Sequence, residues 1–197
     1  MKEDFFMNKN TRFRTRTLTC CALLATLSVI LARLVIPMPN EFTRFSIEAV
    51  PVFLAGMLFG PLAGGLVGFT ADFVGCLLSP YGFNPIFSLP PILYGVCAGL
   101  FRPLLQKRCD VLTIALSFLP AIVFGSVLWQ SFALAFTYSK DTLQESFYGF
   151  LLTRGIQFAV TFVLDVFLVY LLHKSNVFTA LGLWNPMGKK EKHNDYQ

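Results

Sequence analysis

Two arginines lie inside apolar segments that are long enough to span a membrane, Arg33 near the end of the first segment and Arg154 near the start of the last. A cation at the depth of a bilayer costs about 2.5–3.5 kcal/mol on insertion scales, so it usually marks a partner, a pore or a ligand. Arginine presents a planar fork of donors that binds a carboxylate through two hydrogen bonds at once. Because the topology argued below places both arginines toward the outer side, they predict a receptor for an anionic solute.

Further polar and aromatic side chains accompany the arginines. Asp72 lies in the middle of the third apolar segment, where it is a candidate ligand group or the structural partner of an arginine. Asp165 lies deeper in the last segment, and we expect it to be structural or to face a partner protein. The aromatic outer loop after the third segment, residues 79–88, either contacts the ligand or is part of an interfacial aromatic belt. Together with glutamines of the last two segments, this loop supplies the other candidate substrate contacts: Tyr81, Phe83, Asn84, Ser88, Gln130 and Gln157.

The composition is that of a membrane protein. Of the 197 residues, 55% are hydrophobic and 14% are charged, whereas a soluble domain has about 25% charged residues. We predict an all-α integral membrane protein, a compact bundle of six transmembrane helices, because a helix needs about 20 mostly apolar residues to span a bilayer. Pro61, Pro90 and Pro91 should leave the second and fourth helices short, kinked or partly unwound. The apolar segments are residues 17–36, 48–59, 62–79, 86–104, 111–137 and 147–172.

The basic residues predict the orientation of this bundle. Most of the 16 lysines and arginines precede the first apolar segment, separate the fourth from the fifth, or follow the sixth. The positive-inside rule therefore places both termini in the cytoplasm, with a basic segment at residues 1–16, the membrane domain at 17–173 and a polar tail at 174–197. The net charge of +5 then reflects topology and an attraction to anionic lipid, and we expect no nucleic-acid partner.

Small residues at every fourth position of a membrane helix predict a close contact with a neighbouring helix. On the first segment, Ala22, Ala25 and Thr26 form a small-residue surface that is a candidate contact with another membrane protein. Across the second and third segments we expect a run of glycines to pack one helix on the other: Gly56, Gly60, Gly64 and Gly68.

The sequence contains no evident catalytic or metal-binding set. Its two histidines, His173 and His193, lie at or beyond the cytoplasmic end of the last segment, and its five cysteines form no CxxC motif. We therefore expect no metal site, no cofactor and no enzyme activity. The stretch after Gly182 lacks the spacing of a phosphate-binding loop, so ATP-driven transport would need an ATPase on another chain.

One region resembles a known family. The stretch RFSIEAVPVFLAGMLFGPLAGG, from Arg44 to Gly65, and ADFVG, from Ala71 to Gly75, are similar to the substrate-binding (S) components of energy-coupling factor (ECF) transporters, and most similar to the folate members. The resemblance implies a vitamin-binding subunit in a bacterial plasma membrane. It also implies docking through the small-residue surface of the first helix onto a separate transmembrane coupling subunit, with two ATP-binding subunits driving the cycle. Thr26 replaces the second alanine of the family's alanine-x-x-x-alanine pattern.

Folate fits the polar residues that the sequence singles out. Its flat pterin can stack on aromatic side chains, and Arg33 and Arg154 can bind the two carboxylates of its glutamate tail. The loop from Tyr81 to Pro91 departs from the pattern expected of folate members, so another vitamin or base, such as niacin or pantothenate, is the alternative within this class. A structural membrane protein, in which the arginines pair with Asp72 and other residues, is the alternative outside it.

Overall fold

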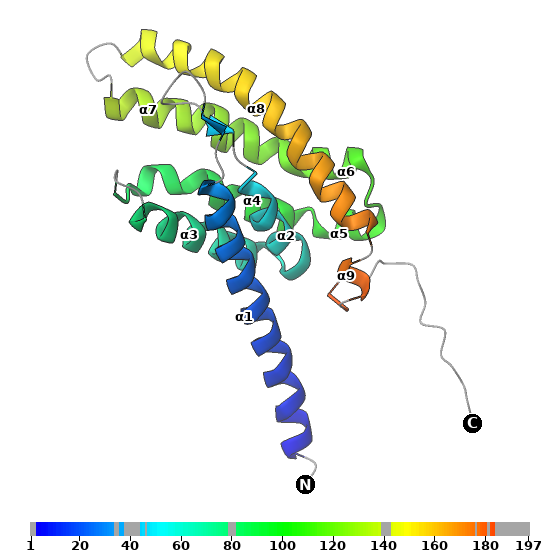
Figure 1. Cartoon of the computed structure of the whole chain (residues 1–197). Helices are drawn as coiled ribbons and strands as arrows, with labels where there is room; N and C mark the ends of the chain where they lie inside the picture. Colours follow the sequence, from blue (N-terminus) through cyan, green and yellow to red (C-terminus); the bar gives the residue numbers. More distant parts are fainter. Residues whose placement is uncertain are drawn as a thin grey trace.

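Proline and glycine divide the apolar sequence into helices. The computed structural model describes residues 3–33, 36–37, 44–45, 47–78, 82–138, 143–175, 177–180 and 182–183. Its α-helices, drawn in Figure 1, are α1 Glu3–Arg33, α2 Ala49–Phe59, α3 Pro61–Leu77, α4 Leu89–Leu100, α5 Arg102–Lys107, α6 Val111–Pro120, α7 Gln130–Tyr138, α8 Leu143–Lys174 and α9 Val177–Ala180. A 3-10 helix precedes α4, a π-helix joins α6 to α7, and two short antiparallel strands lie between α1 and α2: η1 Pro85–Ser88, η2 Ala121–Trp129, β1 Ile36–Pro37 and β2 Arg44–Phe45.

Three helices within the described part of the chain are long and apolar enough to cross a membrane: Thr15–Arg33, Val111–Thr137 and Phe147–Lys174. Three shorter apolar helices accompany them: Ala49–Phe59, Pro61–Leu77 and Pro85–Leu100. These helices correspond to the six apolar segments of the sequence, which confirms the helical fold. Two boundaries differ clearly from those expected. The helix α1 begins at Glu3 and not at residue 17, and the fourth apolar helix ends at Leu100 and not at residue 104, because α5 is a separate helix.

Glycine and proline determine where the short helices begin and end. Gly60 separates α2 from α3 with φ of 102°, a conformation that residues with a Cβ rarely adopt. Pro61 then begins α3, where its missing N–H leaves no hydrogen bond unmade. Pro90 and Pro91 likewise lie in the first turn of α4. The expected short helices are therefore present, with 11 residues in α2 and 12 in α4, but the prolines begin helices and do not kink them.

The glycines bring three backbones together. A Cβ added to Gly64 would lie 2.6 Å from the Cα of Gly56, which confirms the expected contact between α2 and α3. Cβ atoms on either glycine would also overlap the carbonyl oxygen of Gly95 in α4, and one on Gly68 would overlap that of Pro91. The sequence pattern thus identified the glycines but missed α4, which both other helices contact extensively.

The core lies where α2, α4, α6 and α8 meet. The rings of Phe53 and Phe118 stack with centroids 3.9 Å apart, and Tyr94 lies edge-on to Phe118. Val166 and Val169 of α8 complete this buried cluster. Large apolar side chains also cover the outside of the helices, as expected for a surface in contact with lipid tails.

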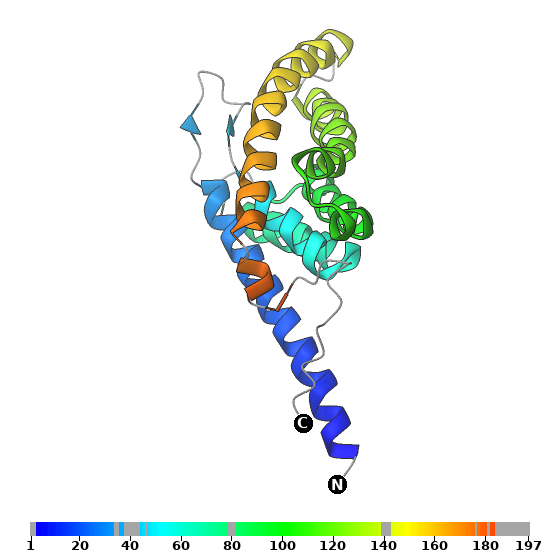
Figure 2. The same cartoon turned by 90° about the vertical axis from the view of Figure 1, so that its right-hand side faces the viewer.

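The helices form two groups that lie against each other. Figure 1 shows α8 alongside the continuous α6–η2–α7 helix, with α2, α3 and α4 beneath them. α1 crosses this assembly obliquely, and its N-terminal half extends beyond it in both views (Figures 1 and 2). The strand β2 contacts α8, so the connection between α1 and α2 reaches the helix that carries Arg154.

Candidate functional site

A row of buried polar side chains follows one face of α8. Arg154, Gln157, Thr161 and Asp165 are spaced by three, four and four residues, which places them on the same side of a helix. Arg154 and Gln157 are each 7% exposed and Asp165 is 1% exposed. The guanidinium of Arg154 lies 5.9 Å from the ring centroid of Phe158, within cation–π range. A membrane helix with an inward polar face and apolar residues outside is typical of a protein that encloses a polar ligand.

The π-helix η2 contacts both α4 and α8. Within η2, Ser126 shares a 2.8 Å hydrogen bond with the hydroxyl of Tyr94 on α4. At the end of η2, the indole N–H of Trp129 donates to the carbonyl oxygen of Ile86 at 2.7 Å, so the outer loop is attached to the start of α7. Gln130 follows at the start of α7 and is half-buried. π-Helical turns are rare and are frequent at functional sites.

The outer loop makes mostly local contacts. Phe83 lies edge-on to Phe73, with ring centroids 5.1 Å apart, and also edge-on to Phe69. Phe69 and Phe73 are both on the exposed face of α3. Asn84 accepts a 3.2 Å hydrogen bond from the backbone N–H of Ile86 and so caps η1. Both residues thus have contacts within the chain, and their expected contact with substrate stays a prediction. Tyr81, the other aromatic candidate in this loop, lies outside the described residues.

Asp72 connects α3 to the start of α4. Its carboxylate accepts a 2.5 Å hydrogen bond from the hydroxyl of Ser88, and the thiol of Cys76 lies 3.9 Å from its other oxygen. Arg33 is exposed and donates to the carbonyl oxygen of Gly75, which joins the end of α1 to α3. Asp72, Ser88 and Arg33 therefore gather near the end of α3, whereas Arg154 and Gln157 lie on α8.

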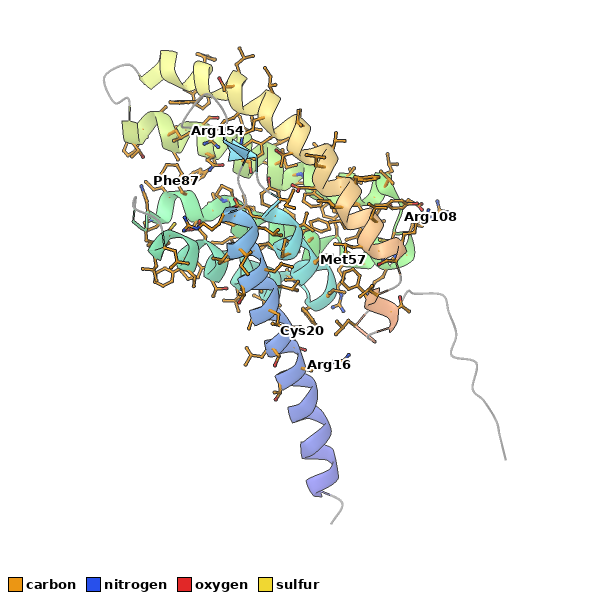
Figure 3. All side chains as sticks on the ribbon, in the orientation of Figure 1. Arg16, Cys20, Met57, Phe87, Arg108 and Arg154 are labelled. Atoms are coloured by element: carbon orange, nitrogen blue, oxygen red, sulfur yellow. The ribbon has the colours of Figure 1, made fainter. Side chains whose placement is uncertain are left out.

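The two arginines thus differ in their surroundings, since Arg33 contacts backbone at an exposed position and Arg154 is buried beside an aromatic ring. Figure 3 shows Arg154 and Phe87 at one end of the bundle and Arg108 at the other. Asp165 was expected to be structural or to face a partner protein. It is buried in the interior of this chain, so the expectation that it faces a partner protein is wrong. Sequence reasoning overlooked Thr161 and the continuation of the row to Asp165, although the spacing of polar residues after Arg154 carries that signal.

The small-residue surface of α1 is narrower than the sequence suggested. Ala22 and Thr26 are exposed, whereas Ala25 is partly buried against the core cluster. The hydroxyl of Thr26 donates to the carbonyl oxygen of Ala22 at 2.9 Å. That hydrogen bond stays within the helix, so the surface offers small apolar side chains to a neighbour.

Metal binding finds no support among the described residues, where no group of three or more His, Cys, Asp or Glu side chains could hold an ion. The burial of Cys109, between α5 and α6, raises the pKa of its thiol to about 12, and neighbouring Asp110 adds to this effect. A thiol with such a pKa is a poor nucleophile or metal ligand near neutral pH.

The amino-acid sequence is similar to that of known transport proteins. The family model of the ECF transporter substrate-specific component matches residues 16–180. The folate transporter FolT of Clostridium novyi is 33% identical over 81 residues, which are 41% of this chain and 46% of that protein. An uncharacterized MG098 homolog of Mycoplasma pneumoniae is 37% identical over 62 residues, 32% of this chain and 13% of that protein. The chain thus aligns with less than half the length of these curated relatives.

The fold is also similar to that of a solved structure. A crystal structure of FolT bound with folic acid has a TM-score of 0.69 to this chain and 25% sequence identity, and the match covers 82% of this chain and 94% of that one. The family match extends from the middle of α1 to the end of α9 and includes the buried polar row of α8. With its helical membrane fold, the chain therefore belongs to the family of substrate-specific (S) components of ECF transporters, which are substrate-binding transport subunits and not enzymes.

Proposed function

We propose that this S component binds folate and delivers it for ATP-driven import. The buried Arg154, at the start of the polar row on α8, is the observation on this chain that supports the proposal best. Family membership and the folate transporters among the matched proteins support the choice of vitamin.

The chemistry of the proposed site follows from the burial of Arg154. A guanidinium removed from water has lost its hydration, so a carboxylate that enters beside it meets a strong electrostatic attraction. The planar fork can bind the carboxylate through two hydrogen bonds, while the ring of Phe158 lies beside the cation. Gln157, one turn along the same face, can bind a second polar group of the glutamate tail.

The remaining candidate residues have different roles in this proposal. Arginine carries five N–H donors, so Arg33 can keep its bond to Gly75 and still attract an anionic tail. Asp72 and Ser88 hold the start of α4 in place, and Phe83 and Asn84 shape the loop next to it. Tyr81 and Gln130 remain proposed ligand contacts.

We also propose six membrane spans with both termini in the cytoplasm of a bacterial cell. The distribution of basic residues supports this orientation. The protruding half of α1 carries Arg16, which lies far from the end marked by Arg154 and Phe87 (Figure 3). The short helices α2, α3 and α4 would cross the bilayer inside the bundle, where their ends are covered by protein.

The proposed partners are a transmembrane coupling subunit and two ATP-binding subunits. Ala22 and Thr26 form the proposed docking surface, because they are small and exposed on a helix that is scarcely covered by its own chain. Small residues let a neighbouring helix approach closely in lipid.

A direct binding measurement tests the choice of vitamin. The full-length protein in detergent is titrated with folic acid, niacin and pantothenate while heat release and tryptophan fluorescence are recorded. Saturable binding of folic acid, without competition from the other two, is the expected result. Preferential binding of niacin or pantothenate would replace folate by that vitamin, and no binding of any of the three would overturn the folate proposal and leave another vitamin or base as the substrate of this S component.

A further inference from the structure

The buried polar row of α8 has opposite charges at its two ends. Arg154 and Asp165 are 11 residues apart, which is about 16 Å along a helix. Gln157 and Thr161 lie between them, and all four side chains are buried. A ligand that lies along this row would meet a cation at one end and a carboxylate at the other.

Asp165 has an unusual environment for a structural carboxylate. It is 1% exposed, and its Oδ1 atom makes no hydrogen bond within the part of the chain that the structure describes. A buried acceptor without a donor is destabilising, and more so when it is ionised. The position is therefore suited to a donor that arrives with a ligand.

Among the described residues, no neighbour of Asp165 donates a hydrogen bond to its Oδ1 atom. The hydroxyl of Tyr94, on α4, lies within electrostatic range but already shares a hydrogen bond with Ser126. Glu48, at the start of α2, is a charged group in range, and its negative charge repels that of Asp165. Tyr94 and Phe118 add aromatic rings to this part of the bundle.

We propose that Asp165 forms the deep end of the ligand site and binds two adjacent N–H groups on the edge of a planar heterocycle. In folate these would be the ring N–H and the exocyclic 2-amino group of the pterin. This inference rests on the proposed function, because it needs a ligand with carboxylates at one end and such a heterocycle at the other. Arg154 would then select the acidic end and Asp165 the pterin.

The test compares two ligands on the wild-type protein. The full-length protein in detergent is titrated with folic acid and with its analogue in which a methyl group replaces the 2-amino group. A hydrogen bond to a charged group contributes about 1.5–3 kcal/mol, so the wild type should bind folic acid about 10- to 100-fold more tightly than the analogue. Equal affinities for the two ligands would overturn the inference.

The variants assign that preference to one side chain. Asp165→Asn should weaken folic acid binding by about tenfold or more and bring the two affinities close together. Ser117→Ala is the matched control, because the buried hydroxyl of Ser117 donates to the carbonyl oxygen of Thr113 in the same helix, α6, and it should keep the full preference. A folded Asp165→Asn protein that keeps the preference would overturn the inference while leaving folate binding in place. If the wild type fails to bind folic acid at all, the proposed function fails, and this inference fails with it.

Discussion

The apolar segments within α1 and α8, residues 17–36 and 147–172, are similar in outline, since each is long enough to span a membrane and contains one arginine, but the fold uses them differently. Only 6% of the apolar window of α1 is buried, compared with 28% for α8. α8 turns its polar residues inward, whereas α1 leaves Ala22 and Thr26 exposed and its arginine on the surface. The two arginines therefore have different surroundings, and the proposed ligand contact of Arg154 rests on the buried polar face of α8. The predictions below test this division between an outward-facing and an inward-facing helix.

The largest expected effect is that of Arg154→Ala on folate binding. Removing one partner of a buried, hydrogen-bonded charge pair costs about 2–5 kcal/mol, which corresponds to about 30- to 4,000-fold in affinity. Lysine at this position should rescue only part of the loss, because it lacks the planar fork. Titration of folic acid into each purified variant, beside its melting curve, measures both affinity and folding.

Leu152→Ala is the control for this prediction, since Leu152 lies on the exposed side of the same helix, 72% exposed. It should bind folate like the wild type. Normal affinity in a folded Arg154→Ala protein would remove Arg154 from the site, and a lowered melting temperature with unchanged affinity would assign it a structural role.

The second prediction concerns the outward-facing helix. Ala22→Trp or Thr26→Trp should abolish folate uptake by cells that contain the coupling subunits, because a large ring prevents close approach of a partner helix. Binding to the isolated protein should remain near the wild-type value. Leu152→Trp places the same ring on another exposed position and should leave uptake intact. A parallel loss of binding and uptake would show that this surface is needed for the fold of the chain itself.

The third prediction tests the close contact between α3 and α4. Gly64→Ala should destabilise the protein by about 1–3 kcal/mol, as overpacking typically does, since the added Cβ would overlap backbone atoms of Gly95. Gly75→Ala is the matched control in the same helix, because its added Cβ would have no neighbouring side chain or facing backbone within 4 Å. It should be neutral or slightly stabilising. Thermal melting in detergent decides, and equal melting temperatures would contradict the close contact between α3 and α4.

The positions of the helices along the chain were predictable from local chemistry, but which helices pack against each other was not. Hydropathy and the Gly60–Pro61 pair placed the ends of α2 and α3 within two residues, because these signals act along the chain. That Gly56 and Gly64 pack on Gly95 depends on the tertiary arrangement, which a spacing rule cannot provide.

The candidate site shows the same limit. Arg154 was recognisable because a cation in an apolar segment is costly anywhere in a bilayer. Asp165 looked equally suited to a partner surface, because the sequence does not say which face of α8 is covered. Residue type alone predicts that Phe83 and Asn84 contact the ligand, and it could not predict their contacts with Phe73 and Ile86 within the chain.

The smallest expected effect is that of Arg33→Ala, and it sharpens the comparison between the two arginines. Arg33 is exposed and its hydrogen bond goes to the carbonyl oxygen of Gly75, so water can replace much of what is lost. A net contribution of about 0.5–1.5 kcal/mol for such a bond corresponds to about 2- to 12-fold in affinity, if the bond keeps the end of α1 in position for binding. Arg33→Lys should restore nearly all of it, because one ammonium N–H suffices for a carbonyl acceptor, in contrast to the partial rescue at Arg154. Folic acid titrations of the four arginine variants, made in one detergent and at one salt concentration, provide the comparison. A loss for Arg33→Ala as large as that for Arg154→Ala, with little rescue by lysine, would mean that both arginines bind carboxylates directly and that burial does not distinguish them.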